Sequence, residues 1–144
     1  MCNNTYKKST LEIFNPSTQT LAATTGLFQF TDILEDTGCS IDFVSPSIVR
    51  INKSGLYLVL FTTNLNTGTT AGTISTALNV NDIPVKTITT IATATASNRS
   101  IIIPALISVP KSCNCIDNTK KITVINNGIS ADYSESDLIV INLA

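Results

Sequence analysis

Residues 55–61 read Gly-Leu-Tyr-Leu-Val-Leu-Phe, and this segment limits the possible folds more than any other part of the chain. In an extended strand, successive side chains point to opposite faces of the sheet. One face carries Tyr57, Val59 and Phe61, and the other carries Leu56, Leu58 and Leu60. A sheet with one face in water alternates apolar and polar residues instead. We therefore expect both faces of this strand to be buried, one in the domain core and the other against a partner, most simply another copy of the chain.

The composition favours a single β domain with little exposed charge. The 144 residues can bury a core without disulfides, and they include 22 Thr and 19 Ile, which both favour strands. Charged residues make up 13% of the chain, about half the usual share, which suits a surface partly covered by neighbours. The net charge of -1 gives no electrostatic basis for binding nucleic acid or an anionic membrane.

The sequence contains no motif that indicates an enzyme. It has no histidine, which removes Ser-His and Cys-His pairs, and it has no glycine-rich phosphate loop. Two acidic clusters remain, one at Asp32, Glu35 and Asp36 and one at Asp132, Glu135 and Asp137. A calcium site or a catalytic carboxylate pair is an alternative for them. Acids are common in turns, so we expect both clusters to lie in solvated loops.

Four cysteines allow a second metal hypothesis. Cys113 and Cys115 form one short C-x-C, and Cys2 and Cys39 could complete four sulfur ligands for zinc. Structural zinc sites usually pair two such knuckles, and disulfides are unusual in a cytosolic product. We therefore prefer reduced thiols in a loop, and we expect no metal and no cofactor.

The N-terminal residues indicate synthesis in a cytosol. Residues 1–8 contain lysines without a following apolar core, so they do not form a secretory signal. No apolar run approaches the ~20 residues that cross a bilayer. We interpret residues 1–15 as a short polar arm and residues 16–144 as one domain.

Turn signals recur at roughly the 8–12-residue spacing that is typical of β-sandwiches and barrels. We expect strands over residues 18–22, 26–30, 40–43, 47–51, 56–64, 74–80, 85–93, 99–109, 122–125 and 137–143. The last of these is almost wholly apolar after Asp137, which predicts a central strand. About ten strands indicate an all-β fold of two packed antiparallel sheets.

Gly55, Tyr57 and Phe61, with Phe43 upstream, form a pattern that resembles the complement C1q-like and tumour-necrosis-factor-like jelly rolls. Val59 replaces the middle aromatic residue of that pattern. Three further segments, 76–84, 122–128 and 136–143, are similar to the bacterial branch of the superfamily. That branch includes C-terminal domains of exosporium collagen-like glycoproteins and related phage proteins. The resemblance implies a jelly roll of about ten strands that forms a tight homotrimer.

The chain lacks the collagen-like stalk of spore-surface glycoproteins and the signal of secreted ligands. We therefore expect a non-enzymatic phage component on the virion surface, either a capsid decoration or a head-fibre protein, made in the host cytoplasm. The arm of residues 1–15 would bind a capsid protein or another virion protein.

A carbohydrate- or receptor-binding adhesin of the same fold is the main alternative, and a spore-surface protein is another. An adhesin that binds a host surface glycan would use an exposed aromatic side chain, for which Tyr6 and Tyr133 are the candidates.

The resemblance and the doubly apolar strand together predict the residues at the threefold axis. We predict a trimer interface formed by Tyr57, Val59, Phe61, Ile139, Ile141 and Leu143. Leu56, Leu58 and Leu60 would then fill the core of the sandwich. The sequence also allows the reverse assignment of the two sides.

Overall fold

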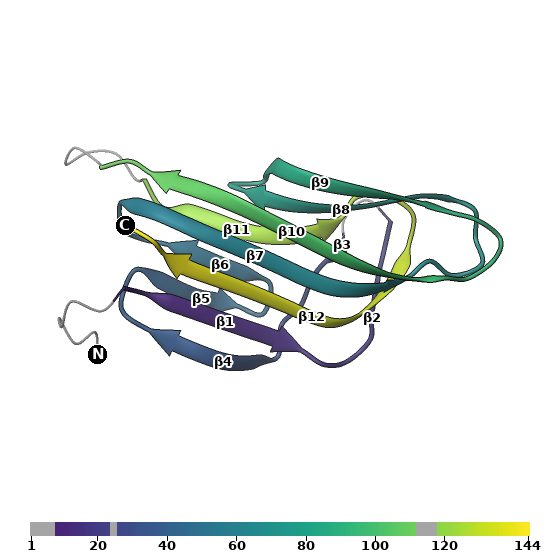
Figure 1. Ribbon diagram of the computed structural model, residues 1–144, viewed down its shortest axis with the longest axis horizontal. Helices are drawn as coiled ribbons and strands as arrows, with labels where there is room; N and C mark the ends of the chain where they lie inside the picture. The colour runs from purple at the N-terminus through teal and green to yellow at the C-terminus, as the bar shows by residue number, and fades with distance from the viewer. Residues whose placement is uncertain (1–7, 24–25, 112–117) are drawn as a thin grey trace.

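The computed structural model describes residues 8–23, 26–111 and 118–144, which form strands and connecting turns without a helix (Figure 1). The strands are β1 (Thr10–Asn15), β2 (Gln19–Leu21), β3 (Gly26–Leu27), β4 (Asp32–Thr37), β5 (Ile41–Ser45), β6 (Ile48–Ile51), β7 (Gly55–Asn66), β8 (Gly72–Val80), β9 (Ile83–Ala92), β10 (Asn98–Val109), β11 (Lys120–Asn126) and β12 (Ala131–Asn142). They form two six-stranded antiparallel sheets, which confirms the predicted all-β sandwich. Within the described ranges, no helix could cross a membrane.

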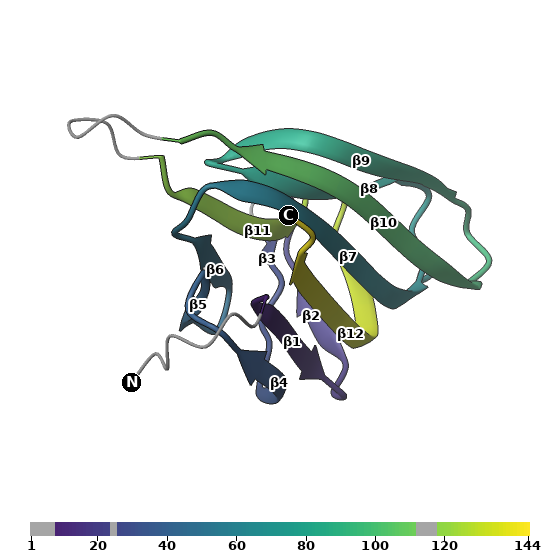
Figure 2. The ribbon, with the colours of Figure 1, turned by 60° about the vertical axis from the view of Figure 1, so that its left-hand side comes forward.

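The two sheets face each other as separate layers (Figure 2). Sheet A has the strand order β10-β7-β12-β1-β4, and β2 also pairs with β12. Sheet B has the order β5-β6-β11-β8-β9, and β3 also pairs with β11. The predicted central position of the last strand is confirmed, because Val140 of β12 lies opposite Val59 of β7 on one side and Leu11 of β1 on the other.

Strand β7 has its two sides in the reverse of the predicted orientation. Tyr57, Val59 and Phe61 point towards sheet B and are fully buried within the single chain. They are therefore core residues, and the prediction that they form a subunit contact is wrong. Leu56, Leu58 and Leu60 lie on the opposite side, where they are half-buried. Between the sheets, Phe61 packs against the ring of Phe28 from the opposite layer, a contact that places the aromatic side of β7 in the core.

An aromatic cluster joins the two sheets. The ring of Phe28, just after β3, lies 4.8 Å from the ring of Phe61 and 4.5 Å from that of Tyr133, both in edge-on contacts. The Tyr133 hydroxyl is 3.0 Å from the Thr76 hydroxyl, and burial raises the pKa of Tyr133 above its usual 10.0. Tyr133 is fully buried, so the prediction that it is an exposed glycan contact is wrong. Its polar neighbours in the sequence concealed an inward-facing strand position.

The boundary predicted at residue 15 is also wrong. Residues 10–15 form β1, which lies between β12 and β4 in sheet A. Leu11 and Ile13 are fully buried, whereas Glu12 and Phe14 between and after them are partly exposed. This alternation is that of a strand with one face in the core. Only residues 1–7 of the predicted arm lie outside the described residues.

Both acidic clusters lie on strands rather than in loops. Asp32, Glu35 and Asp36 belong to β4, the edge strand of sheet A, and the cluster from Asp132 to Asp137 belongs to β12. Charged side chains on an edge strand discourage pairing with other sheets, so the acidic residues of β4 suit its position at the edge of sheet A.

We expect Phe28→Ala to lower the free energy of unfolding by about 3–5 kcal/mol, because it removes the ring between two other aromatic rings and leaves a cavity. Urea denaturation at fixed protein concentration measures this. Phe28→Leu is the control, since it keeps most of the volume and should cost clearly less. A cost below about 1 kcal/mol for Phe28→Ala would contradict the central role of this cluster.

Candidate subunit interface

The side of sheet A that points away from sheet B is apolar at its centre. We call this surface the sheet A face, and its central residues are Leu58 and Leu60 of β7, Ile139 and Ile141 of β12, and Pro104 and Leu106 of β10. The strand register places them in two rows across three strands. Burying such a surface against a partner is favourable by about 25 cal/mol per Å² of apolar area, before association costs are subtracted.

Three of the six predicted interface residues belong to this side of sheet A. Ile139 and Ile141 are half-buried on β12, and Leu143 follows the end of the strand with 37% of its surface exposed. Their place in a subunit contact stays a prediction. The β7 positions on this side are those of Leu56, Leu58 and Leu60.

A second apolar surface lies along one edge of the sandwich. Strand β10 ends sheet A and β9 ends sheet B, and the two strands run next to each other (Figure 1). We call this surface the β9/β10 edge. It carries five large apolar side chains that are at least half exposed, namely Ile83, Val85, Ile91, Ile102 and Leu106. Exposed apolar side chains on two neighbouring strands make this edge a candidate interaction site.

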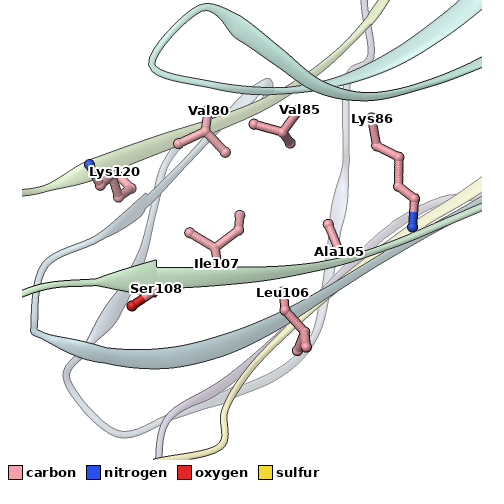
Figure 3. Close-up of a pocket in the computed structure, with 8 residues that line it drawn as sticks. All are labelled: Val80, Val85, Lys86, Ala105, Leu106, Ile107, Ser108 and Lys120. Carbon is pink, nitrogen blue, oxygen red and sulfur yellow. The ribbon is translucent and has the colours of Figure 1, made fainter.

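A groove of about 440 Å³ runs between the two edge strands. In Figure 3, Val80, Val85 and Ile107 point towards one another across it, whereas Leu106 points to the other side of β10. The Lys86 ammonium donates a hydrogen bond of 2.6 Å to the Pro104 carbonyl oxygen, so this side chain bridges the two strands. Lys120 also lines the groove, which is therefore apolar with two basic side chains at its margin.

Two carboxyl groups interrupt the apolar sheet A face. Asp137 of β12 and Glu12 of β1 interact directly, and Asp137 Oδ1 is buried without a hydrogen-bond partner among the described residues. Burial, a hydrogen bond to Glu12 and repulsion from the Glu12 charge raise the pKa of Asp137 to about 6. A β-bulge precedes Asp137, with Glu135 at a positive φ of 51°. The face thus contains a partly buried acidic pair that a cation would stabilise.

A polar depression of about 390 Å³ lies near the C-terminal end of β7 and the N-terminal ends of β10 and β12. Its lining consists of Asn64, Asn98, Arg99, Ser100 and Ser134. The Asn64 amide donates to the Glu135 carboxylate at 2.9 Å. These side chains offer both donors and acceptors to a polar ligand.

The structure corrects one cysteine hypothesis. Cys39 is disulfide-bonded, so the prediction of a reduced thiol is wrong for this residue. The expectation of reduced thiols came from the reducing cytosol, and this does not determine how close two sulfur atoms lie in the fold. Cys2, Cys113, Cys115 and Tyr6 lie outside the described residues. Among the residues that are described, no three His, Cys, Asp or Glu side chains are grouped to hold a metal ion.

Sequence reasoning missed the β9/β10 edge and the acidic pair. Residues 87–95 look like a strand with one wet side, but β9 carries apolar residues on both sides, with Ile88 packed on the core and Ile91 68% exposed. That pattern was a usable signal. The contact between Glu12 and Asp137 had none, because it depends on the pairing of the first described strand with the last.

Comparisons with solved structures show the same fold in proteins of very different sequence. Eiger TNF from S. frugiperda is 14% identical, with a TM-score of 0.67 over 95% of this chain and 93% of that one. Murine APRIL is 12% identical, with a TM-score of 0.61 over 95% and 100%. PRD1 vertex protein P5 is 14% identical, with a TM-score of 0.57 over 94% and 97%. No protein-family model matches the sequence. No curated protein matches it either. The similarities confirm a TNF-like jelly roll.

We expect Asp137→Asn to stabilise the single chain at neutral pH by about 1 kcal/mol, since solvent screening reduces the full effect of the shifted pKa. The pKa of Asp137 is raised in the folded chain, so the folded state favours the protonated carboxyl group. The stability that this gives the wild type is fully present below about pH 4 and is lost as pH rises through about 6. The variant should therefore gain stability over the wild type between these values. Urea denaturation at both ends of this pH range, at a dilution that gives the monomer mass, measures the gain. The exposed Asp36→Asn is the control and should show no such gain.

Proposed function

We propose that this chain is a non-enzymatic structural protein that forms a homotrimer on the surface of a virion. The observation that carries the proposal is the presence of two different apolar surfaces on one chain, the sheet A face and the β9/β10 edge. Both run along the strands. In a single chain the β9/β10 edge is exposed, and the sheet A face is half-buried on β7 and β12 and exposed on β10. The two surfaces differ in shape, since one is a broad face and the other is a narrow edge, so the edge of one copy can pack on the face of another.

A contact between two different surfaces repeats from copy to copy and closes into a ring when the rotation fits. If the edge of one copy packs on the face of the next, both surfaces of every copy are covered. Leu106 would then leave solvent together with Leu58 and Ile141, which lie in the same row of the sheet. The number three comes from the resemblance to TNF-like jelly rolls, and the similar fold of Eiger TNF and APRIL supports it.

The virion location is supported by the similar fold of PRD1 vertex protein P5. We propose that residues 1–7 bind a capsid protein or another virion protein. They precede Lys8, whose ammonium donates to the Leu143 carbonyl oxygen at 2.5 Å. Lys8, the first described residue, therefore lies at the end of the sandwich where β12 finishes.

An adhesin of the same fold is the second candidate function. The polar depression at Asn64, Asn98 and Arg99 favours it, because amide and guanidinium groups suit hydroxyl-rich or acidic sugars. Arg99→Ala would then abolish binding on a glycan array, with Arg50→Ala on the outer side of sheet B as the matched control.

Light scattering should give the mass of a trimer at micromolar concentration. We expect Leu58→Asp to give a folded monomer, since a buried unpaired charge would oppose assembly while the monomer leaves this position partly exposed. Val44→Asp is the matched control, because Val44 is an exposed apolar residue of β5 outside both surfaces, and it should leave the trimer intact. A wild-type chain that stays monomeric would remove the proposal.

Immunogold labelling with an antibody against this chain should place it on the outside of virus particles from the producing cells. Removal of residues 1–7 should abolish the labelling of particles and leave the trimer mass unchanged, because β1 begins only at Thr10. Normal labelling by the truncated chain would contradict the attachment role, and label on free protein alone would contradict the virion location.

A further inference from the structure

Acidic and basic side chains are divided between the two proposed contact surfaces. Glu12 and Asp137 lie in the sheet A face, and β4 adds two exposed acids beside them, since Glu35 pairs with Glu12 and Asp32 pairs with Phe14. The β9/β10 edge instead presents Lys86 and Lys120 at its groove. The described chain is thus negative on one surface and positive on the other.

Lys86 and Glu12 lie at the same height along the strands of sheet A. The Lys86 ammonium is 2.6 Å from the carbonyl oxygen of Pro104. Pro104 lies opposite Leu60, Leu60 opposite Ile139, and Ile139 opposite Glu12. These residues form one row across four strands. Rotation about an axis that runs along the strands does not change the height of a residue along that axis. Lys86 of one subunit would therefore lie at the same height as Glu12 of the next.

We infer that the Lys86 ammonium of each subunit pairs with the Glu12 and Asp137 carboxyl groups of the next subunit, an inference that rests on the proposed trimer. Covering the acidic pair with apolar side chains alone would remove its remaining solvation without compensation. Lys86 supplies the missing cation, and its flexible stem lets it reach from the groove margin. Asp137 Oδ1 is itself buried, so the ammonium acts on this carboxyl group through its charge and not through a contact with that atom.

The pairing also selects how copies associate. Face against face would bring the carboxyl groups of Glu12, Asp137 and Glu35 together with their own copies, and edge against edge would bring lysines together. Like charges at a contact are costly, so both symmetric dimers are disfavoured. Face against edge is the arrangement in which opposite charges meet. The charges would thereby favour a closed ring over a dimer.

Charge reversal tests the pair directly. Sedimentation would give the half-dissociation concentration of the wild type, Lys86→Glu, Glu12→Lys and the double variant. We expect each single reversal to raise this concentration at least about tenfold, and the double variant to return within about threefold of the wild type, because only contacting residues show such compensation. Arg50→Glu makes the same change of charge on the outer side of sheet B and should have little effect.

The outcomes separate the two proposals. A monomeric wild type would remove the proposed trimer and this pair with it. A wild-type trimer in which Lys86→Glu behaves like Arg50→Glu would overturn the pair alone, as would a double variant no tighter than the single ones. Thermal unfolding checks that each variant folds. If Lys86→Glu does not fold, Lys86→Met replaces it and should still weaken the trimer several-fold, because it removes the cation without adding an acid.

The sign of the pH dependence gives an independent readout. Glu12 from β1, Asp32 and Glu35 from β4, and Asp137 from β12 are the titratable groups here. In the inferred contact, Lys86 of the next subunit faces them. If Lys86 pairs with ionised carboxylates, the trimer should dissociate more as pH falls from about 7 to about 5. In Lys86→Met the dependence should vanish or reverse, because protonation then lowers the cost of burying the acids. A wild-type trimer that tightens on acidification would contradict the pair.

Discussion

The rest of the structure depends on the burial of one side of β7 against sheet B. Tyr57, Val59 and Phe61 have no exposed surface, and Phe61 contacts the ring of Phe28 from the opposite layer. Once these side chains point inward, the alternation of the strand turns Leu58 and Leu60 outward. The register of β10 and β12 then aligns their outward residues with the leucines in rows. The packing of the core thus determines the composition of a surface that the core does not use.

The two proposed contact surfaces are connected through the same hydrogen-bonded rows. Leu106 belongs to the edge by its exposure and to the face by its register, so the apolar region continues around the end of sheet A. Counted from β10, Asp137 of the acidic pair lies two strands further along on β12, and Glu12 lies three strands further along on β1, next to the edge strand β4. A single sheet therefore presents an apolar side and an acidic side to its neighbours, which gives a subunit contact a direction.

Much of the fold could be predicted from the sequence, because strand propensity and turn residues act locally. The all-β class, the central last strand and most strand positions follow from such signals. The orientation of β7 did not, since a period of two separates Tyr57 from Leu58 without saying which of them faces inward. Strand β1 was missed because its apolar residues lie among polar ones near the N-terminus. The acidic pair depends on which strands become neighbours, and no local pattern of residues encodes that. The apolar residues on both sides of β9 were a local signal for the edge, but its groove also depends on β10 lying next to β9.

The central position of β12 in sheet A has a consequence for synthesis on the ribosome. Strands β7 and β1 have no contact with each other through sheet A until β12 is inserted between them. Because β12 is translated after the other eleven strands, the nascent chain presents β7 with an unpaired edge for most of its synthesis. Exposed edges of apolar strands pair readily with other chains. Sheet A therefore cannot join β7 to β1 before β12, the last of the described strands, has been made.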